Sequence, residues 1–224
     1  MKKVLKAILI VLIILTIAVG VIAAWQWQNI RSIMLGIKEN DAEISKRRDE
    51  NQTQLIDSVN TFMDEPLREM TEEENKQIEE GKISAAEIYQ KMFEEKNSQL
   101  EQKKDADIPT KDEIVSSYMA ELYKLQNEFT ARAESTIKQG ASYYESIKAH
   151  PQDPVARANT ITHFTPIVRG MEKECDAKVE EVISKLKAEL EKIKADTSII
   201  GSIRATYSRE KQLKLSYYAN KYLR

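Results

Sequence analysis

The sequence predicts an all-α protein, with an N-terminal transmembrane helix followed by an elongated helical bundle that contains an antiparallel coiled-coil hairpin. Three observations lead to this prediction. Residues 7–25 form one uninterrupted apolar run. Glycine (6) and proline (5) are scarce and 31% of the residues are charged, so the residues that tight turns and β-hairpins need are few. Apolar residues recur at three- and four-residue steps over most of the remaining chain.

Residues 7–25 are predicted to be the transmembrane helix. The run contains no charged side chain, and Thr16 is its only polar one. A helix of this length spans about 30 Å of hydrocarbon. The alternative is a secretion signal that is cleaved after residues 21–23, which leaves a secreted protein. The length of the run and the tryptophans at its end, Trp25 and Trp27, favour a retained signal anchor.

The charges that flank this run predict its orientation. Three lysines precede it: Lys2, Lys3 and Lys6. Only Arg31 and Lys38 follow it at a comparable distance. The positive-inside rule therefore places residues 1–6 in the cytoplasm and the C-terminal domain on the extracytoplasmic side of the cell membrane. Because six residues are too few to fold, we expect the chain to have no cytoplasmic output of its own.

Residues 26–65 are predicted to form a membrane-proximal helical stalk. An apolar stripe at helical spacing covers both ends of this segment, but Arg48 and Asn51 interrupt it. We therefore expect residues 38–54 to be exposed to solvent.

Residues 66–109 are predicted to form an acidic segment with a short helix over 72–80 and a longer one over 85–104. Two serine or threonine residues precede a glutamate by three positions, the capping-box spacing of a helix start: Thr71 with Glu74, and Ser84 with Glu87. From residue 38 to residue 107 the acidic residues outnumber the basic ones by 20 to 11.

Residues 110–196 are predicted to form the antiparallel coiled-coil hairpin. Thr110 with Glu113 begins the first helix, and Asp153 with Pro154 begins the second. Pro166 either kinks the second helix or splits it. Beyond Pro166 the apolar residues alternate three- and four-residue steps: Val168, Met171, Cys175, Val179, Val182, Leu186, Leu190 and Ile193. We expect residues 118–147 to be buried against residues 155–193.

Residues 197–224 are predicted to form a basic, tyrosine-rich C-terminal helix. From residue 185 to the C-terminus there are 10 basic and 4 acidic residues. Cationic and aromatic side chains together can bind a polyanion or an acidic partner. The competing interpretation, which we favour, is that the tyrosines pack in the bundle and the lysines face water or the acidic residues 72–101. The candidate contact residues are Arg204, Tyr207, Arg209, Lys211, Lys214, Tyr217, Tyr218, Lys221 and Tyr222.

The sequence indicates no catalytic, cofactor-binding or metal-binding residue. The two histidines, His150 and His163, stand near Asp153 and Cys175 without the spacing of a zinc or di-iron site. A single cysteine cannot form an intramolecular disulfide, so Cys175 is either a buried apolar residue or pairs with another chain.

These patterns predict a non-enzymatic, membrane-anchored interaction or scaffold protein whose partners are the lipid bilayer and either another protein or a second copy of the chain. Nucleic-acid binding is not expected, because the chain beyond the three N-terminal lysines is acidic. The alternative is a ligand-sensing or accessory ectodomain that works through a separate membrane partner. A cavity lined by Tyr118, Phe129, Tyr143 or Tyr144 would favour the sensor, and a solid core with an exposed apolar stripe would favour the scaffold.

Overall fold

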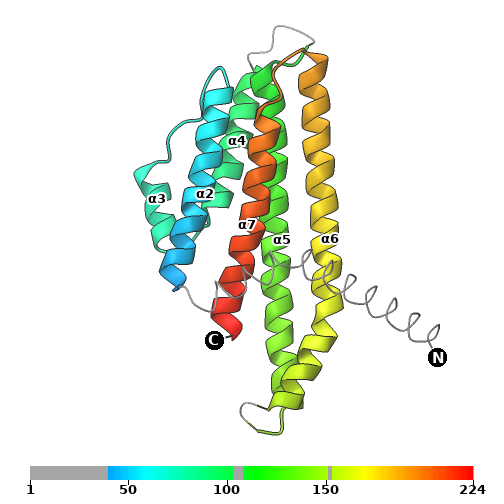
Figure 1. Ribbon diagram of the computed structural model, residues 1–224. Coiled ribbons are helices and arrows are strands. Elements are labelled where there is room, and N and C mark those ends of the chain that lie inside the picture. Colours follow the sequence, from blue (N-terminus) through cyan, green and yellow to red (C-terminus); the bar gives the residue numbers. More distant parts are fainter. Residues whose placement is uncertain (1–39, 103–107, 151–152, 224) are drawn as a thin grey trace, which may run out of the picture. The chain divides into compact units, whose positions relative to one another are not determined.

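The computed structural model describes residues 40–102, 108–150 and 153–223. These residues form α-helices and no strands, which confirms the all-α prediction (Figure 1). The predicted cytoplasmic segment 1–6, the predicted transmembrane helix 7–25 and the start of the predicted stalk lie outside the described residues. Within the described ranges, no helix combines the length and the apolar character that a membrane span requires.

The described helices belong to two compact units. The first unit contains α2 (Asp41–Phe62) as far as Asp57, and α7 (Ile199–Leu223) from Gly201. The second unit extends from Ser58 to Ile200. It contains four complete helices: α3 (Glu72–Glu79), α4 (Ala85–Gln102), α5 (Lys111–Ile147) and α6 (Pro154–Lys192).

The predicted helix starts in the second unit are confirmed by their hydrogen bonds. In the capping boxes of α3 and α5, the threonine side chain accepts from the glutamate N–H and the glutamate side chain accepts from the threonine N–H. Ser84 and Glu87 make the same reciprocal pair before α4, at 2.8 and 3.2 Å. The Asp153 carboxylate caps α6 by accepting from two backbone N–H groups of its first turn. Pro166 lies within one continuous α6, so it does not split the helix.

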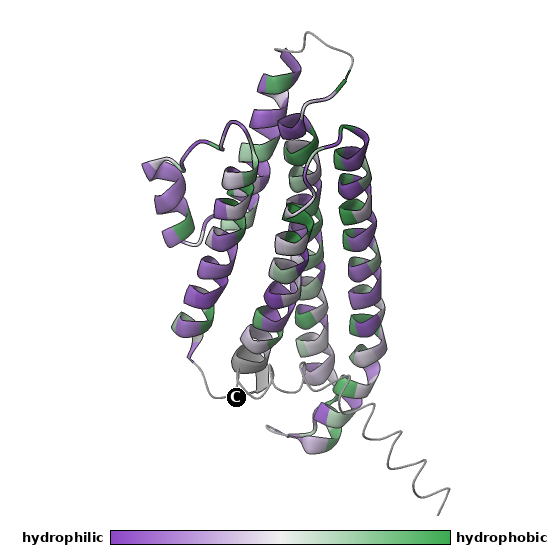
Figure 2. Cartoon of the chain, turned by 45° about the horizontal axis from the view of Figure 1, so that its top comes forward, coloured by the Kyte–Doolittle hydropathy of each residue, from purple (hydrophilic) through white to green (hydrophobic). Residues whose placement is uncertain are grey.

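Polar contacts hold α3, which is mostly hydrophilic (Figure 2). Arg68 donates to both carboxylate oxygens of Glu74 at 2.7 Å and to Glu95 of α4 at 3.0 Å. The Arg68 guanidinium lowers the pKa of Glu74 to about 2. Gly81, with φ +67°, ends this helix by donating its N–H to the Ile78 carbonyl at 2.9 Å, a left-handed turn that favours glycine.

The hydrophobic core of the second unit lies along α5 and the two helices that pack on it. Helix α5 packs on both α4 and α6. The ring of Tyr123 lies 5.6 Å from that of Tyr89 and 5.8 Å from that of Phe93. The buried apolar side chains of α5 and α6 are Ile114, Val115, Met119, Tyr123, Phe129, Ala156, Val179, Val182, Ile183, Leu186 and Leu190.

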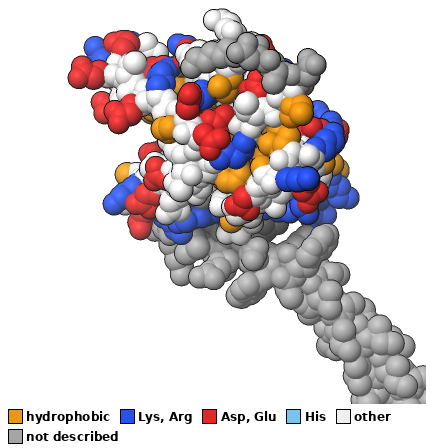
Figure 3. All heavy atoms as spheres, turned by 90° about the horizontal axis from the view of Figure 1, so that it is seen from above, with side chains coloured by type: hydrophobic (Ala, Val, Ile, Leu, Met, Phe, Trp, Pro, Cys, Tyr) orange, Lys and Arg blue, Asp and Glu red, His pale blue; other side chains and the backbone are white. Residues whose placement is uncertain are grey.

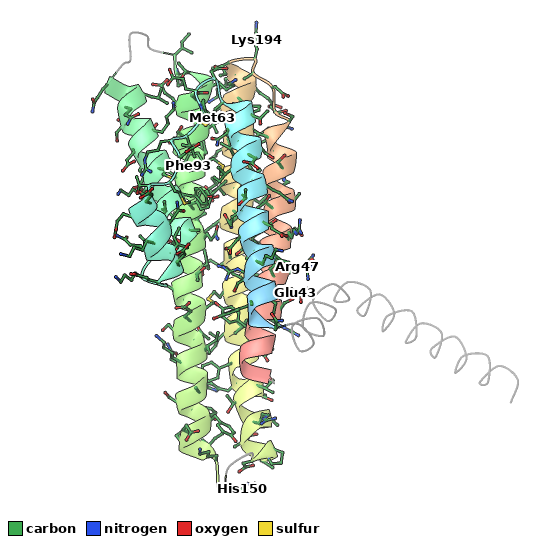
Figure 4. The ribbon with its side chains drawn as sticks, turned by 90° about the vertical axis from the view of Figure 1, so that its left-hand side faces the viewer. Glu43, Arg47, Met63, Phe93, His150 and Lys194 are labelled. Atoms are coloured by element: carbon green, nitrogen blue, oxygen red, sulfur yellow. The ribbon has the colours of Figure 1, made fainter. Side chains whose placement is uncertain are left out.

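Helices α5 and α6 are antiparallel, since Arg132 pairs with Glu174 and Tyr143 stacks on His163. His150, in the loop between them, and Lys194, just beyond α6, lie at opposite ends of this hairpin (Figure 4). Both helices extend past α4 towards His150 (Figures 1 and 4). From above, hydrophobic side chains are visible among charged side chains of both signs (Figure 3).

Most of the described residues of the predicted exposed stalk, 38–54, are exposed, but the prediction is wrong at the positions that are buried. In the first unit, Ile44 and Asn51 are buried. Asn51 donates to the Thr206 carbonyl of α7 at 3.2 Å, and Arg48 donates to the buried carboxylate of Glu210 at 3.1 Å. The polar residues that interrupt the apolar stripe of α2 therefore find polar partners on α7 instead of water.

Candidate functional site

The structure brings five of the nine predicted contact residues onto one face of α7. Arg204, Tyr207, Lys211, Lys214 and Tyr218 follow one another at three- and four-residue steps along the helix. Of these, Arg204 is exposed and the others are half-buried. This cationic, aromatic face borders the stripe through which α7 is buried.

The remaining four predicted residues are placed differently. Arg209 lies on the other side of α7, where it donates to Gln54 of α2 at 3.2 Å. The Arg48 guanidinium lies 6.0 Å from the centre of the Tyr217 ring, so this tyrosine contacts α2. The side chains of Lys221 and Tyr222 lie outside the described residues.

A second candidate surface is the part of the hairpin that extends beyond the core. We define the hairpin arm as residues 130–178. Among its described residues only Asp153 and Ala156 are buried. The helices contact each other there through an aromatic cluster, in which Tyr143 stacks on His163 at 4.9 Å and lies edge-on to Phe164 at 5.9 Å. The prediction that residues 118–147 are buried against 155–193 is therefore wrong for the arm, because two helices alone bury only their line of contact.

A charged cluster marks the end of the core. Phe129 is buried, and two cations lie over its ring: Arg132 at 4.8 Å and Lys178 at 5.5 Å from the ring centre. Glu174 accepts from Arg132 at 2.8 Å and pairs with Lys178 at 2.9 Å. These two cations lower the pKa of Glu174 to about 2. The cluster closes the edge of the core with cation–π contacts and ion pairs.

The arm carries large apolar side chains that face solvent. On α6, Ile161 is 54% exposed and Val168 is 43% exposed. Steps of seven, eleven and seven residues lead from Ile161 through Val168 to the buried Val179 and Leu186. Each step returns to nearly the same side of an α-helix at roughly 100° per residue. The apolar stripe of α6 thus extends from the core into the arm, where Glu172 interrupts it, and it is covered only in the core.

Other exposed apolar residues of the arm lie off this stripe. Val155 is 66% exposed and lies about 120° around the helix from Ile161. Ile167 of α6 and Ile147, the last residue of α5, are also exposed.

The residues considered above as possible metal ligands each have a structural environment of their own. Asp153 caps α6, and His163 stacks on Tyr143. Cys175 is half-buried and forms no disulfide within the described part of the chain. In the described part of the chain, no group of three or more His, Cys, Asp or Glu side chains is placed to hold a metal ion.

One buried carboxylate has a role that sequence reasoning missed. Asp112, in the first turn of α5, accepts from the backbone N–H groups of Asp64 and Glu65, both at 2.8 Å. It therefore ties the segment after α2 to the start of α5. Its position beside a capping box is the only sequence signal, and that position does not reveal the distant partner.

Comparison with known proteins adds no relative: no protein-family model, no curated protein and no solved structure matches this chain.

Proposed function

We propose that this chain is a membrane-anchored, non-enzymatic helical interaction or scaffold protein that acts on the exported side of a membrane through its hairpin arm. The exposed α6 stripe at Ile161 and Val168 is the observation that carries this proposal. Single exposed apolar residues are common on protein surfaces. Here they extend a stripe that is buried at Val179 and Leu186. An exposed extension of a buried apolar helix face is typical of a protein-binding surface.

The lengths of the two helices suit the display of such a face. Helix α5 has 37 residues and α6 has 39. At 1.5 Å per residue each is about 55 Å long, so the arm presents its stripe well away from the core. In the proposed architecture this hairpin is a coiled coil, and the N-terminal run 7–25 anchors the chain in the bilayer with residues 1–6 in the cytoplasm.

The aromatic contacts of the hairpin support a scaffold more than a ligand sensor. A ligand cavity within the hairpin would need aromatic side chains that are open to a ligand. Phe129 is instead covered by Arg132 and Lys178, and Tyr143 stacks on His163. These rings already pack against partners within the chain, which favours a surface that binds other helices.

The topology is tested by labelling cysteines in intact cells with a membrane-impermeant maleimide. Gly170 of α6 is exposed, with open space where a side chain would begin, so Gly170→Cys introduces an accessible thiol into the arm. In a Cys175→Ala background we expect this thiol to be labelled without permeabilisation, and Lys3→Cys to be labelled only after it. Labelling of Lys3→Cys alone in intact cells would reverse the proposed orientation.

The role of the arm is tested by affinity capture of the full chain from membranes. We expect Ile161→Ser/Val168→Ser to lose proteins that the wild-type chain captures. The matched control is Ile147→Ser/Val155→Ser, which removes the same kinds of exposed side chain from other faces of the arm. If both double variants capture the same proteins as the wild type, the stripe is not the interaction surface.

A further inference from the structure

We propose that the partner of the arm is a second copy of this chain, with the two α6 helices packed antiparallel around a two-fold axis between Phe164 and Thr165. This inference deepens the proposed function and rests on it in one respect, namely that the exposed α6 stripe is an interaction surface. It adds the identity of the partner and the register of the contact.

The register follows from the positions of the exposed apolar residues. In a two-fold antiparallel helix pair, residues equally far from the axis on the two copies lie at the same height. An axis between Phe164 and Thr165 places Ile161 of one copy opposite Val168 of the other, and the reverse. Both exposed residues of the stripe are then covered at once, each by the other.

The same axis also pairs opposite charges. It places Arg157 of one copy opposite Glu172 of the other, on both sides of the apolar centre. At roughly 100° per residue, Arg157, Ile161, Val168 and Glu172 lie within about 60° of one another around α6. Four residues of one helix face thus make a self-complementary surface, with an apolar centre and a charged rim.

The overall charge of the arm suits a second copy better than a polyanion or an anionic membrane. Residues 130–178 contain seven lysine or arginine residues and six aspartate or glutamate residues. Charges of both signs are interspersed along the arm, so neither sign dominates and the net charge gives two copies little reason to repel each other. A surface specialised for phosphate-rich partners would carry an excess of positive charge.

The contact is small, so we expect a reversible dimer. Two apolar residues and two charged residues per copy form less than the roughly 800 Å² per partner of a standard stable interface. The dimer should therefore form and dissociate over an accessible range of protein concentration.

Charge reversal tests the proposed pair directly. Arg157→Glu places a glutamate opposite Glu172 of the other copy, and Glu172→Arg places an arginine opposite Arg157. We expect each single variant of the full chain, purified in detergent, to weaken dimerisation about tenfold or more in sedimentation equilibrium, because like charges then face each other twice. The double variant Arg157→Glu/Glu172→Arg should restore wild-type dimerisation.

The rescue is informative because it cannot come from within one chain. Arg157 and Glu172 are fifteen residues apart on the same helix, which separates them by about 22 Å. Far-UV circular dichroism of each variant checks that α-helical content is unchanged. Dimerisation that is insensitive to the single reversals, or a double variant no better than either single one, would overturn the proposal.

Disulfide trapping tests the register independently. In a Cys175→Ala background, Ile161→Cys/Val168→Cys should form a disulfide-linked dimer under mild oxidation. The wild-type chain should not, because the proposed axis separates the two copies of Cys175 by about 31 Å along the helices. Trapping through Cys175, or none through the engineered pair, would contradict the register.

The outcomes separate this inference from the proposed function. If Ile161→Ser/Val168→Ser loses a different captured protein while charge reversal leaves self-association unchanged, the second copy is the wrong partner and the interaction surface stands. If that double variant changes neither capture nor self-association, both proposals fail.

Discussion

The boundary between the core and the hairpin arm predicts a large difference in stability between two substitutions on one stripe of α6. Leu186 is 0% exposed, and Leu→Ala at fully buried sites costs roughly 2–5 kcal/mol through lost transfer free energy and the cavity left behind. We expect Leu186→Ala to lower the free energy of unfolding by about 3 kcal/mol. Val168 is 43% exposed, so Val168→Ala should cost no more than about 0.5 kcal/mol.

Urea denaturation of the full chain in detergent, followed by far-UV circular dichroism, measures both values. Because the described helices form two units, the variants are compared on the transition that Leu186→Ala shifts. The protein concentration is kept below the dissociation constant of the proposed dimer, since association would stabilise the wild type by mass action. A cost for Val168→Ala within about 1 kcal/mol of that for Leu186→Ala would show that the arm is packed like the core.

Three further substitutions follow from the polar contacts. Asp112→Ala should lower the free energy of unfolding by about 2 kcal/mol in the same assay, because two backbone N–H groups lose their acceptor, whereas Asp112→Asn keeps an acceptor and should cost less. Glu210→Ala should cost about 2 kcal/mol, because it leaves Arg48 and Asn51 without their shared acceptor, and Glu210→Gln should be milder. The pKa of Glu174 is about 2, below its ordinary value, so the stability that its carboxylate contributes is present at neutral pH and is lost as the pH falls from about 4.5 towards 2. Glu174→Gln should therefore lower Tm at pH 7, and the difference from the wild type should shrink steadily as the pH is lowered towards 2.

Local features of the structure could be predicted from the sequence because local chemistry determines them. The three capping boxes and the Asp153 cap depend on residues three positions apart or fewer, and each is present as predicted. The all-α class follows from the same kind of signal, repeated along the chain.

The features that could not be predicted depend on distant partners. Arg48 and Asn51 are predicted to face solvent because they are polar, but Glu210, far along the chain, supplies a buried polar partner. Val168 and Leu186 belong to the same periodic pattern. Val168 is exposed and Leu186 is buried because of the tertiary packing, which the pattern does not contain. For the same reason the spacing alone could not identify the arm as a candidate surface.

Site-specific photo-crosslinking in native membranes tests most directly the claim that the exposed stripe of the arm is an interaction surface. A photoreactive residue is placed at Ile161 in the arm or, as the control, at Lys187, which is exposed on α6 beside the core. We expect a protein crosslink at position 161, to a second copy of the chain, and little or none at position 187. No protein crosslink at position 161, or equal yields at both positions, would contradict it.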